Sequence, residues 1–116
     1  MPNIEENHLL HLFSHCPVCG AKTFAEDTEK SKRCKACGFQ YFMNPSASTV
    51  AIIVDEMGRL LSVRRSKEPA KGTLDLPGGF ADSMETAEEG VAREVLEETG
   101  LKVTSTKYLF SLPNIY

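Results

Sequence analysis

Two Cys-x-x-Cys-Gly segments, starting at Cys16 and Cys34, are the strongest constraint on how this 116-residue chain folds. Two intervening residues let both thiolates of a tight turn face one ion, and the glycine after each pair permits the backbone conformation of such a turn. Four thiolates complete a tetrahedral zinc site and leave no position for water, so the zinc is expected to be structural rather than catalytic. The sequence therefore predicts a small zinc ribbon with four ligands: Cys16, Cys19, Cys34 and Cys37.

The N-terminal sequence and the hydropathy of the chain bear on its compartment. The segment Met-Pro-Asn-Ile-Glu-Glu has no basic region followed by an apolar one, so we expect no signal peptide. The longest uncharged apolar run, Thr49 to Val54, is far too short to span a membrane. A cytoplasmic, reducing location is the resulting expectation. It favours metal binding by the cysteines over the two alternatives, disulfide bonds or buried free thiols.

Three histidines precede the first cysteine pair. His8, His11 and His15 fall on one face of a short helix, and metal binding by them is the less favoured of two interpretations. The favoured one is an amphipathic helix that packs its apolar side chains inward: Leu9, Leu10, Leu12 and Phe13. Residues 21–33, between the cysteine pairs, are expected to form a short hairpin.

Pro45 marks a boundary, because proline ends the preceding segment and restricts the residue before it. We therefore expect residues 1–45 to form an N-terminal segment with the zinc ribbon, and residues 46–116 to form a second domain. Apolar runs in the second domain predict a buried strand at residues 49–54 and a further strand at residues 59–65, joined as a hairpin.

An acidic helix is predicted after the Gly78-Gly79 turn, whose two glycines allow close approach to the backbone. Thr86 and Glu89 have the spacing of a capping box at the start of this helix, and Gly100 supplies the stop at its end. The side chains expected to pack on the sheet lie on the opposite side from the acids: Val91, Ala92, Val95, Leu96 and Thr99.

Glu94, Glu97 and Glu98 span an arc of about 100° on this helix, with Arg93 at its border. Gly90 falls in the same arc and is expected to leave access to the carboxylates open. The alternative is a solvated surface face, but such faces usually intersperse lysine, and this arc has none. Carboxylates on a rigid helix, beside a turn that offers a carbonyl, suit Mg²⁺ or Mn²⁺. Such ions bridge phosphate oxygens and activate water, so the arc predicts metal-assisted phosphate chemistry.

The charge balance disfavours nucleic acid and membranes as bulk partners. The net charge is −3, and within residues 79–101 seven acids face a single base, Arg93. The cysteine module carries only a weak basic patch: Lys22, Lys30, Lys32, Arg33 and Lys35. A nucleotide-type small molecule, bound through divalent ions, is the expected partner.

The spacing around this helix resembles a complete Nudix box. Gly79 is followed after five residues by Glu85, and after seven more by Arg93-Glu94-Val95-Leu96-Glu97-Glu98-Thr99-Gly100-Leu101. The resemblance to the Nudix family covers about residues 46–112 and implies an α/β/α sandwich with a mixed sheet, so the expected fold class is α/β (α+β). A four-cysteine zinc ribbon ahead of a Nudix domain is similar to the arrangement of NADH pyrophosphatases.

The resemblance implies a divalent-metal-dependent hydrolase that cleaves the pyrophosphate bond of a nucleoside diphosphate linked to another group. The implied ligands of Mg²⁺ or Mn²⁺ are one backbone carbonyl and three side chains: Gly79, Glu94, Glu97 and Glu98. By the same resemblance, Arg93 orients the glutamates and Glu85 supports the loop–helix junction. The general base is Glu94, Glu97 or a glutamate outside the box.

Basic residues ahead of the glycine turn are tentative substrate ligands. Arg64 and Arg65, with Lys67 and Lys71, are placed to touch phosphate. A solvated strand edge and loop is an equally favoured interpretation of these side chains.

The segment after the box departs from the NADH pyrophosphatase pattern. That subgroup carries Ser-Gln-Pro-Trp-Pro-Phe there, whereas this chain has Ser111-Leu-Pro-Asn-Ile-Tyr116. The missing glutamine and tryptophan disfavour NADH as the substrate. Two alternatives to an enzyme stay open: a nucleotide-sensing or regulatory domain without catalysis, and a ribbon that binds a partner or nucleic acid.

Length adds one more expectation. The Nudix sandwich normally needs more residues than 46–116 provide, so we expect a domain truncated at its C-terminus. The sequence does not set the oligomeric state, and a homodimer is one open arrangement.

Overall fold

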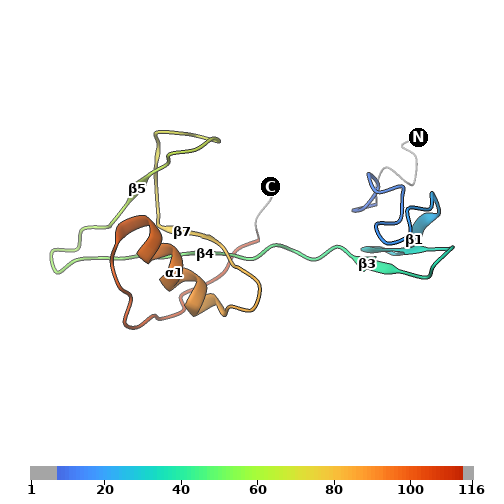
Figure 1. The fold of residues 1–116 in the computed structure, drawn as a ribbon. Helices are drawn as coiled ribbons and strands as arrows, with labels where there is room; N and C mark the ends of the chain where they lie inside the picture. The colour runs from blue at the N-terminus through green and yellow to red at the C-terminus, as the bar shows by residue number, and fades with distance from the viewer. Residues whose placement is uncertain (1–7, 114–116) are drawn as a thin grey trace. The chain divides into compact units, whose positions relative to one another are not determined.

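The computed structural model describes residues 8–113, and the chain divides into two compact units, residues 1–45 and 46–116 (Figure 1). The described residues form seven short strands and one helix, which makes the fold α+β, as expected. No helix in the described part of the chain is long and apolar enough to cross a membrane.

The N-terminal unit is built on a three-stranded antiparallel sheet of β1 (Phe24–Thr28), β2 (Ser31–Cys34) and β3 (Gln40–Phe42), in that order. β1 and β2 form the hairpin predicted between the cysteine pairs. The small core of this unit consists of Cys16, Phe24 and Cys34, with Phe39 stacked on Phe24 at a ring separation of 6.4 Å. Two of the three core residues are cysteines, so a metal ion bound to them would stabilise the folded unit directly.

The amphipathic helix predicted before the first cysteine is wrong for the described residues, where residues 8–12 form turns. His8 is buried, and its Nε2 donates to the Thr28 carbonyl at 2.7 Å while its Nδ1 accepts from the Leu10 N–H at 3.1 Å. Leu10 points inward, but Leu9, Leu12 and Phe13 are more than half exposed. The imidazole of His8 ties this segment to β1 and competes with the backbone bonds of a helix.

The C-terminal unit contains β4 (Ser48–Val50), β5 (Val63–Arg64), β6 (Leu74–Asp75), β7 (Gly78–Phe80) and α1 (Ala87–Thr99). β4 pairs with β7 and β5 pairs with β6, and both pairs are antiparallel. α1 packs against β7 and β4, as Figure 1 shows. Residues 101–113 follow the helix without forming a helix or strand.

The hairpin predicted at residues 49–65 is present but has shorter strands than expected. A bridge joins Val54 to Leu60, and the Leu61 N–H donates to the Ile53 carbonyl at 2.9 Å. Asp55 closes the turn by accepting from two backbone N–H groups through its carboxylate. These local bonds fix the hairpin even though regular β-structure covers only part of it.

The prediction that residues 49–54 form a buried strand is wrong for one face. Val50, Ile52 and Val54 are 60%, 49% and 54% exposed, whereas the alternate residues Thr49, Ala51 and Ile53 are partly buried. Successive side chains of a strand point to opposite faces, and α1 covers only one of them. The apolar run therefore predicted extended structure correctly. It did not predict that the described residues leave one face of this segment exposed.

The two ends of α1 agree with the sequence. The Thr86 side chain accepts from the Glu89 N–H at 3.1 Å, which is the N-cap expected of the capping box. Gly100 adopts the left-handed conformation with φ 76° and donates its N–H to the Leu96 carbonyl. Val95 is completely buried, whereas Leu96, predicted to pack on the sheet, is 52% exposed.

Candidate functional site

The four cysteines come together as predicted. Their Sγ atoms all lie within 4.8 Å of one another, and the Cys16–Cys37 and Cys19–Cys34 pairs are each 3.6 Å apart. A disulfide requires about 2.05 Å, and all four thiols are free. In a tetrahedron with Zn–S bonds of about 2.3 Å, neighbouring sulfur atoms are about 3.8 Å apart. The cluster therefore has the dimensions of a four-thiolate zinc site.

Backbone donors point at the sulfur atoms of Cys16 and Cys34 and stabilise their thiolate forms. The N–H groups of Val18 and Cys19 point at Cys16 Sγ, at 3.4 and 3.5 Å, and the Cys37 N–H points at Cys34 Sγ at 3.5 Å. A hydrogen bond from the Thr23 hydroxyl is the main cause that lowers the pKa of the Cys34 thiol to about 6. Despite a backbone hydrogen bond at Phe39, burial and the neighbouring thiols raise the pKa of the Cys37 thiol to about 11. Thiolate is the form that binds metal, so the donor set fits a structural metal ion.

The glycines after the cysteine pairs have the role that the sequence indicated. Gly20 and Gly38 have φ angles of 78° and 83°, in the region that side chains other than glycine rarely adopt. Each donates its N–H to the carbonyl of the first cysteine in its pair, at 2.9 Å. Both turns of the site therefore have the same geometry.

Arg93 is the centre of the second candidate site. Its guanidinium lies 2.8 to 3.3 Å from four carboxylates and also donates to the Phe80 carbonyl at 3.2 Å. The four carboxylates come from the loop before α1 and from α1 itself: Asp82, Glu85, Glu94 and Glu97. Asp82 was not singled out from the sequence, because it occupies a variable position of the box spacing. Arg93 thus links the loop to the helix, and its pKa is raised, chiefly by Glu85.

Glu85 lies at the junction between the loop and α1, as the resemblance implied. The Arg93 guanidinium, and after it the Asp82 N–H, hold the pKa of the Glu85 carboxyl at about 2. A Cβ built on Gly90 would lie 2.9 Å from Glu85 Oε1. The Glu85 carboxylate therefore fills the space beside Gly90. This corrects the expectation that the glycine leaves access to the acids of α1 open.

Gly79 of β7 lets one acid of α1 lie directly against the strand, and the backbone of Gly78 contacts a second acid. A Cβ on Gly79 would lie 2.6 Å from Glu94 Oε1, and the Gly78 N–H donates to Glu98 Oε2 at 3.2 Å. Any side chain at Gly79 would displace the Glu94 carboxylate. This cradle at Gly79 holds the Glu94 carboxylate, and carboxylate oxygens are ligands that Mg²⁺ or Mn²⁺ prefers.

The predicted metal ligands are neighbours, but their carboxylates do not converge. Glu94 and Glu97 are turned toward Arg93, and Glu98 is turned toward Gly78. Among residues 8–113, the cysteine cluster alone brings three or more potential ligand atoms close enough to share one ion. The oxygen donors and the glycine cradle fit a hard divalent cation, and rotation of the glutamate side chains is needed to complete its shell. The assignment of these ligands remains a prediction.

Arg64 and Arg65 are engaged within their own loop. Arg64 donates to the Gly72 carbonyl, and Arg65 pairs with Asp75 at 3.0 Å and donates to the Pro69 carbonyl at 2.8 Å. In the described part of the chain, no ion pair joins either arginine to the acids of α1. Their bonds support a role in shaping the loop, and substrate binding by them remains a prediction.

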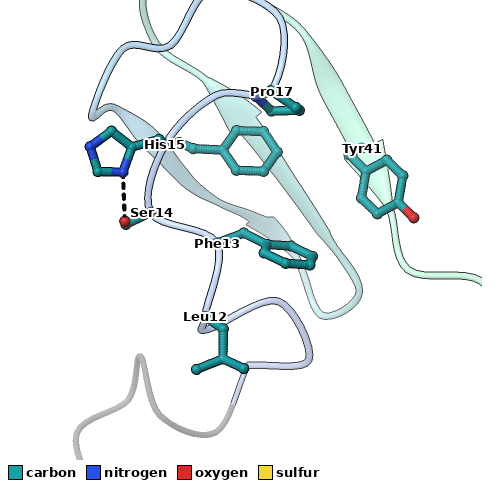
Figure 2. A pocket seen from close by; sticks show the side chains of 7 residues that line it. Leu12, Phe13, Ser14, His15, Pro17 and Tyr41 are labelled. Atoms are coloured by element: carbon teal, nitrogen blue, oxygen red, sulfur yellow. Dashed lines mark hydrogen bonds between the residues drawn. The ribbon is translucent and has the colours of Figure 1, made fainter.

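A hollow of about 400 Å³ in the N-terminal unit was not anticipated from the sequence (Figure 2). Its lining is mainly aromatic and apolar: Leu12, Phe13, Ser14, His15, Pro17, Phe24 and Tyr41. Phe24 belongs to the core of the unit, whereas Phe13 and Tyr41 are 51% and 43% exposed. Aromatic residues close to the cysteines in the sequence were the available signal, but the sequence alone does not show that Phe13 and Tyr41 are exposed.

Comparison with known proteins identifies the second unit. The family model of the NUDIX domain matches residues 44–116, which is more than half of the chain. The chain belongs to the Nudix family. This confirms the family resemblance carried by the box, and the clustered cysteines before it are consistent with the zinc ribbon.

Two related proteins are similar to this chain beyond the Nudix box. A protein named NAD-capped RNA hydrolase NudC from Haemophilus influenzae (strain PittGG) is 33% identical over 113 residues, which cover 95% of this chain and 42% of the relative. A protein named ADP-ribose pyrophosphatase from Methanocaldococcus jannaschii is 38% identical over 78 residues, covering 66% of this chain and 46% of the relative. The chain thus spans less than half the length of these relatives.

A solved structure supports the fold. The crystal structure of a NUDIX hydrolase from Nitrosomonas europaea matches with a TM-score of 0.63 at 30% identity. The match covers 74% of this chain and 51% of that one. The matched part of the chain therefore has a Nudix-type fold.

Proposed function

We propose that this Nudix chain serves a hydrolase that cleaves the pyrophosphate bond of a nucleoside diphosphate linked to another group, with Mg²⁺ or Mn²⁺ as cofactor. The observation that carries the proposal is the complete set of box acids on α1 beside the Gly79 cradle. The names of the relatives, an NAD-capped RNA hydrolase and an ADP-ribose pyrophosphatase, both describe compounds with such a bond.

In this proposal, Glu94, Glu97, Glu98 and the Gly79 carbonyl hold the ions. Bound ions supply charge neutralisation on the phosphates and lower the pKa of a water molecule that attacks phosphorus. Arg93 contacts Glu94 and Glu97 and limits the directions in which they turn. Glu94 or Glu97 is the proposed general base, since both lie beside the bound ions.

The arginine keeps its place because Glu85 and Asp82 hold it from the loop side. Glu85 bonds two guanidinium nitrogens, at 3.0 and 2.8 Å. If Glu94 and Glu97 turned to a cation, Arg93 would keep these loop contacts and its bond to the Phe80 carbonyl. These bonds would hold the loop–helix junction in place while the metal ligands turn.

For the cysteine cluster we propose Zn²⁺ with a purely structural role. All four ligand positions are thiolates, which supports a closed site without bound water. The proposal leaves the substrate to the second unit. The cytoplasmic location and the open possibility of a homodimer stay predictions.

The nucleic-acid expectation needs a direct test, because the name of one group of relatives contains RNA. The missing glutamine and tryptophan still disfavour free NADH as the preferred compound. We therefore include both free and RNA-linked dinucleotides among the candidate substrates.

A substrate panel with the full-length protein tests the proposal. NADH, ADP-ribose, dinucleoside polyphosphates, nucleoside triphosphates and NAD-capped RNA are each incubated with Mg²⁺ or Mn²⁺, and released nucleoside monophosphates are separated by chromatography. Metal-dependent cleavage at a pyrophosphate bond is the expected result. Tight binding of a nucleotide without turnover of any compound would instead support the sensing or regulatory alternative.

A further inference from the structure

Thr49 carries a buried polar atom without a partner. Its Oγ1 is the buried side-chain oxygen or nitrogen that makes no hydrogen bond among the described residues. A buried hydroxyl that stays unpaired destabilises a fold, whereas valine would fill the same space without that cost. A hydroxyl at this place is therefore available to donate to an acceptor that turns toward it.

The strand register shows where this hydroxyl lies. Thr49 on β4 is directly opposite Gly79 on β7. Directly opposed residues of an antiparallel pair project to the same face, with Cβ positions about 4.5–5.5 Å apart. On that face, a Cβ at Gly79 would lie 2.6 Å from Glu94 Oε1 and 2.9 Å from Oε2. Thr49 therefore projects to the same side of the strand pair as the Glu94 carboxylate.

Glu94 is the acceptor that we assign to the Thr49 hydroxyl. α1 packs on both β4 and β7, and the Glu94 side chain is only 15% exposed. Glu94 Oε1 accepts from Arg93 at 3.0 Å. A carboxylate has about four acceptor sites, so one oxygen can bind a cation while the other accepts from a hydroxyl.

We propose that Thr49 is a positioning residue of the candidate divalent-metal site: its hydroxyl donates to the Glu94 carboxylate when Glu94 turns from Arg93 to the ion. The proposal rests on the proposed function for the identity of the site, but it concerns metal binding and not the substrate. Hydrogen bonds to the ligands of a metal orient them, and their loss typically weakens metal affinity by about 10–100-fold.

The competing explanation is that Thr49 is only a β-branched residue that suits a strand. Valine and serine separate the two explanations, because Thr49→Val keeps the shape and removes the hydroxyl, whereas Thr49→Ser keeps the hydroxyl and removes the branch. A purely structural role predicts that valine is the harmless substitution. The positioning role predicts that serine is.

The experiment measures Mn²⁺ affinity by electron paramagnetic resonance, on full-length protein without substrate. Thr49→Val is expected to weaken Mn²⁺ binding about 10-fold or more without lowering Tm in the absence of added metal, and Thr49→Ser is expected to retain affinity within about twofold. Ser48→Ala, an exposed hydroxyl on the same strand, is the matched control and should change neither. Unchanged Mn²⁺ affinity in a folded Thr49→Val variant would overturn the proposal.

A double-mutant cycle tests whether the hydroxyl acts through Glu94. In a Glu94→Gln background, Thr49→Val is expected to have little further effect on Mn²⁺ affinity. An equal loss in both backgrounds would show that Thr49 acts elsewhere and would overturn the assignment. A wild-type protein that binds Mn²⁺ in this way but hydrolyses no compound would refute the proposed activity and leave the role of Thr49 standing. Absence of Mn²⁺ binding would refute both.

Discussion

At the residue scale, Arg93 and Glu85 explain how an acidic loop and an acidic helix are held together. Arg93 meets four carboxylates, and Glu85, whose side chain is 12% exposed, makes the shortest of these ion pairs. Ion pairs that share one guanidinium and are partly shielded from water are better fixed than isolated surface pairs. This network makes two predictions for single residues.

The first concerns the pH dependence of stability. The pKa of Glu85 is about 2 in the folded chain against an ordinary value of 4.5. A depressed pKa stabilises the fold fully above about pH 4.5, and the contribution is lost as the pH falls toward 2. The difference in unfolding free energy between wild type and Glu85→Gln should therefore be constant near neutral pH and shrink below pH 4.5. Urea unfolding at a series of pH values measures it, and a difference that grows on acidification would contradict the assignment.

The second concerns Gly90, which is buried within α1. Alanine normally favours a helix interior over glycine by about 1 kcal/mol. Here the added Cβ would push Glu85 away from its donors, because it would lie 2.9 Å from Oε1. Gly90→Ala should therefore stabilise a Glu85→Ala protein, but not wild type. Thermal unfolding of the four members of this cycle checks the prediction, and an equal gain in both backgrounds would show that Gly90 does not serve Glu85.

At the scale of elements, we expect the ribbon to depend on a bound metal ion. The core of the N-terminal unit contains two of the four cysteines, and its strands are three to five residues long. Such a small unit buries too little apolar surface to be stable without cross-links or metal. The four thiolates therefore take the place of a larger core.

Zinc analysis tests this view. Elemental analysis should find one zinc per chain, and chelation or Cys37→Ser should remove it together with the native NMR signals of β1–β3. Lys35→Ala, between the same two cysteines, is the control and should retain both. A folded, zinc-free protein with disulfide bonds would overturn the ribbon.

The elements also show what the sequence predicts well. The caps at Thr86 and Gly100 and the hairpin of β1 and β2 were predicted correctly, because they depend on residues close together in the chain. The helix before Cys16 was predicted wrongly, because the hydrogen bond of His8 to Thr28 joins distant residues that periodicity does not relate. The prediction that residues 49–54 are buried on both faces was wrong for the same reason, because burial depends on which distant elements cover each face of the strand.

The candidate site also has features that the sequence predicts and features that it does not. Spacing alone predicted the four cysteines as a cluster and α1 as the bearer of the box acids. The unpaired hydroxyl of Thr49 was invisible, because its importance follows from the pairing of β4 with β7. Side-chain directions were also beyond the sequence, as the separate orientations of Glu94 and Glu98 show.

At the scale of the whole molecule, the chain combines a cysteine-rich unit with a Nudix domain, and the two divide near Pro45. Its relatives are more than twice as long as the matched segment, so tests of activity belong to the full-length protein. The expectation of a domain truncated at its C-terminus stays a prediction. The acids of α1 remain the part of the molecule from which chemistry is inferred.

Mg²⁺-dependent hydrolysis by full-length Glu97→Gln, compared with wild type on the best compound of the panel, tests this inference most directly. The Glu97 side chain is 57% exposed, so the substitution should leave Tm and zinc content unchanged. Loss of a metal ligand or general base should lower turnover about 100-fold or more. Turnover equal to that of wild type would contradict the assignment of the acids of α1 as the catalytic metal site.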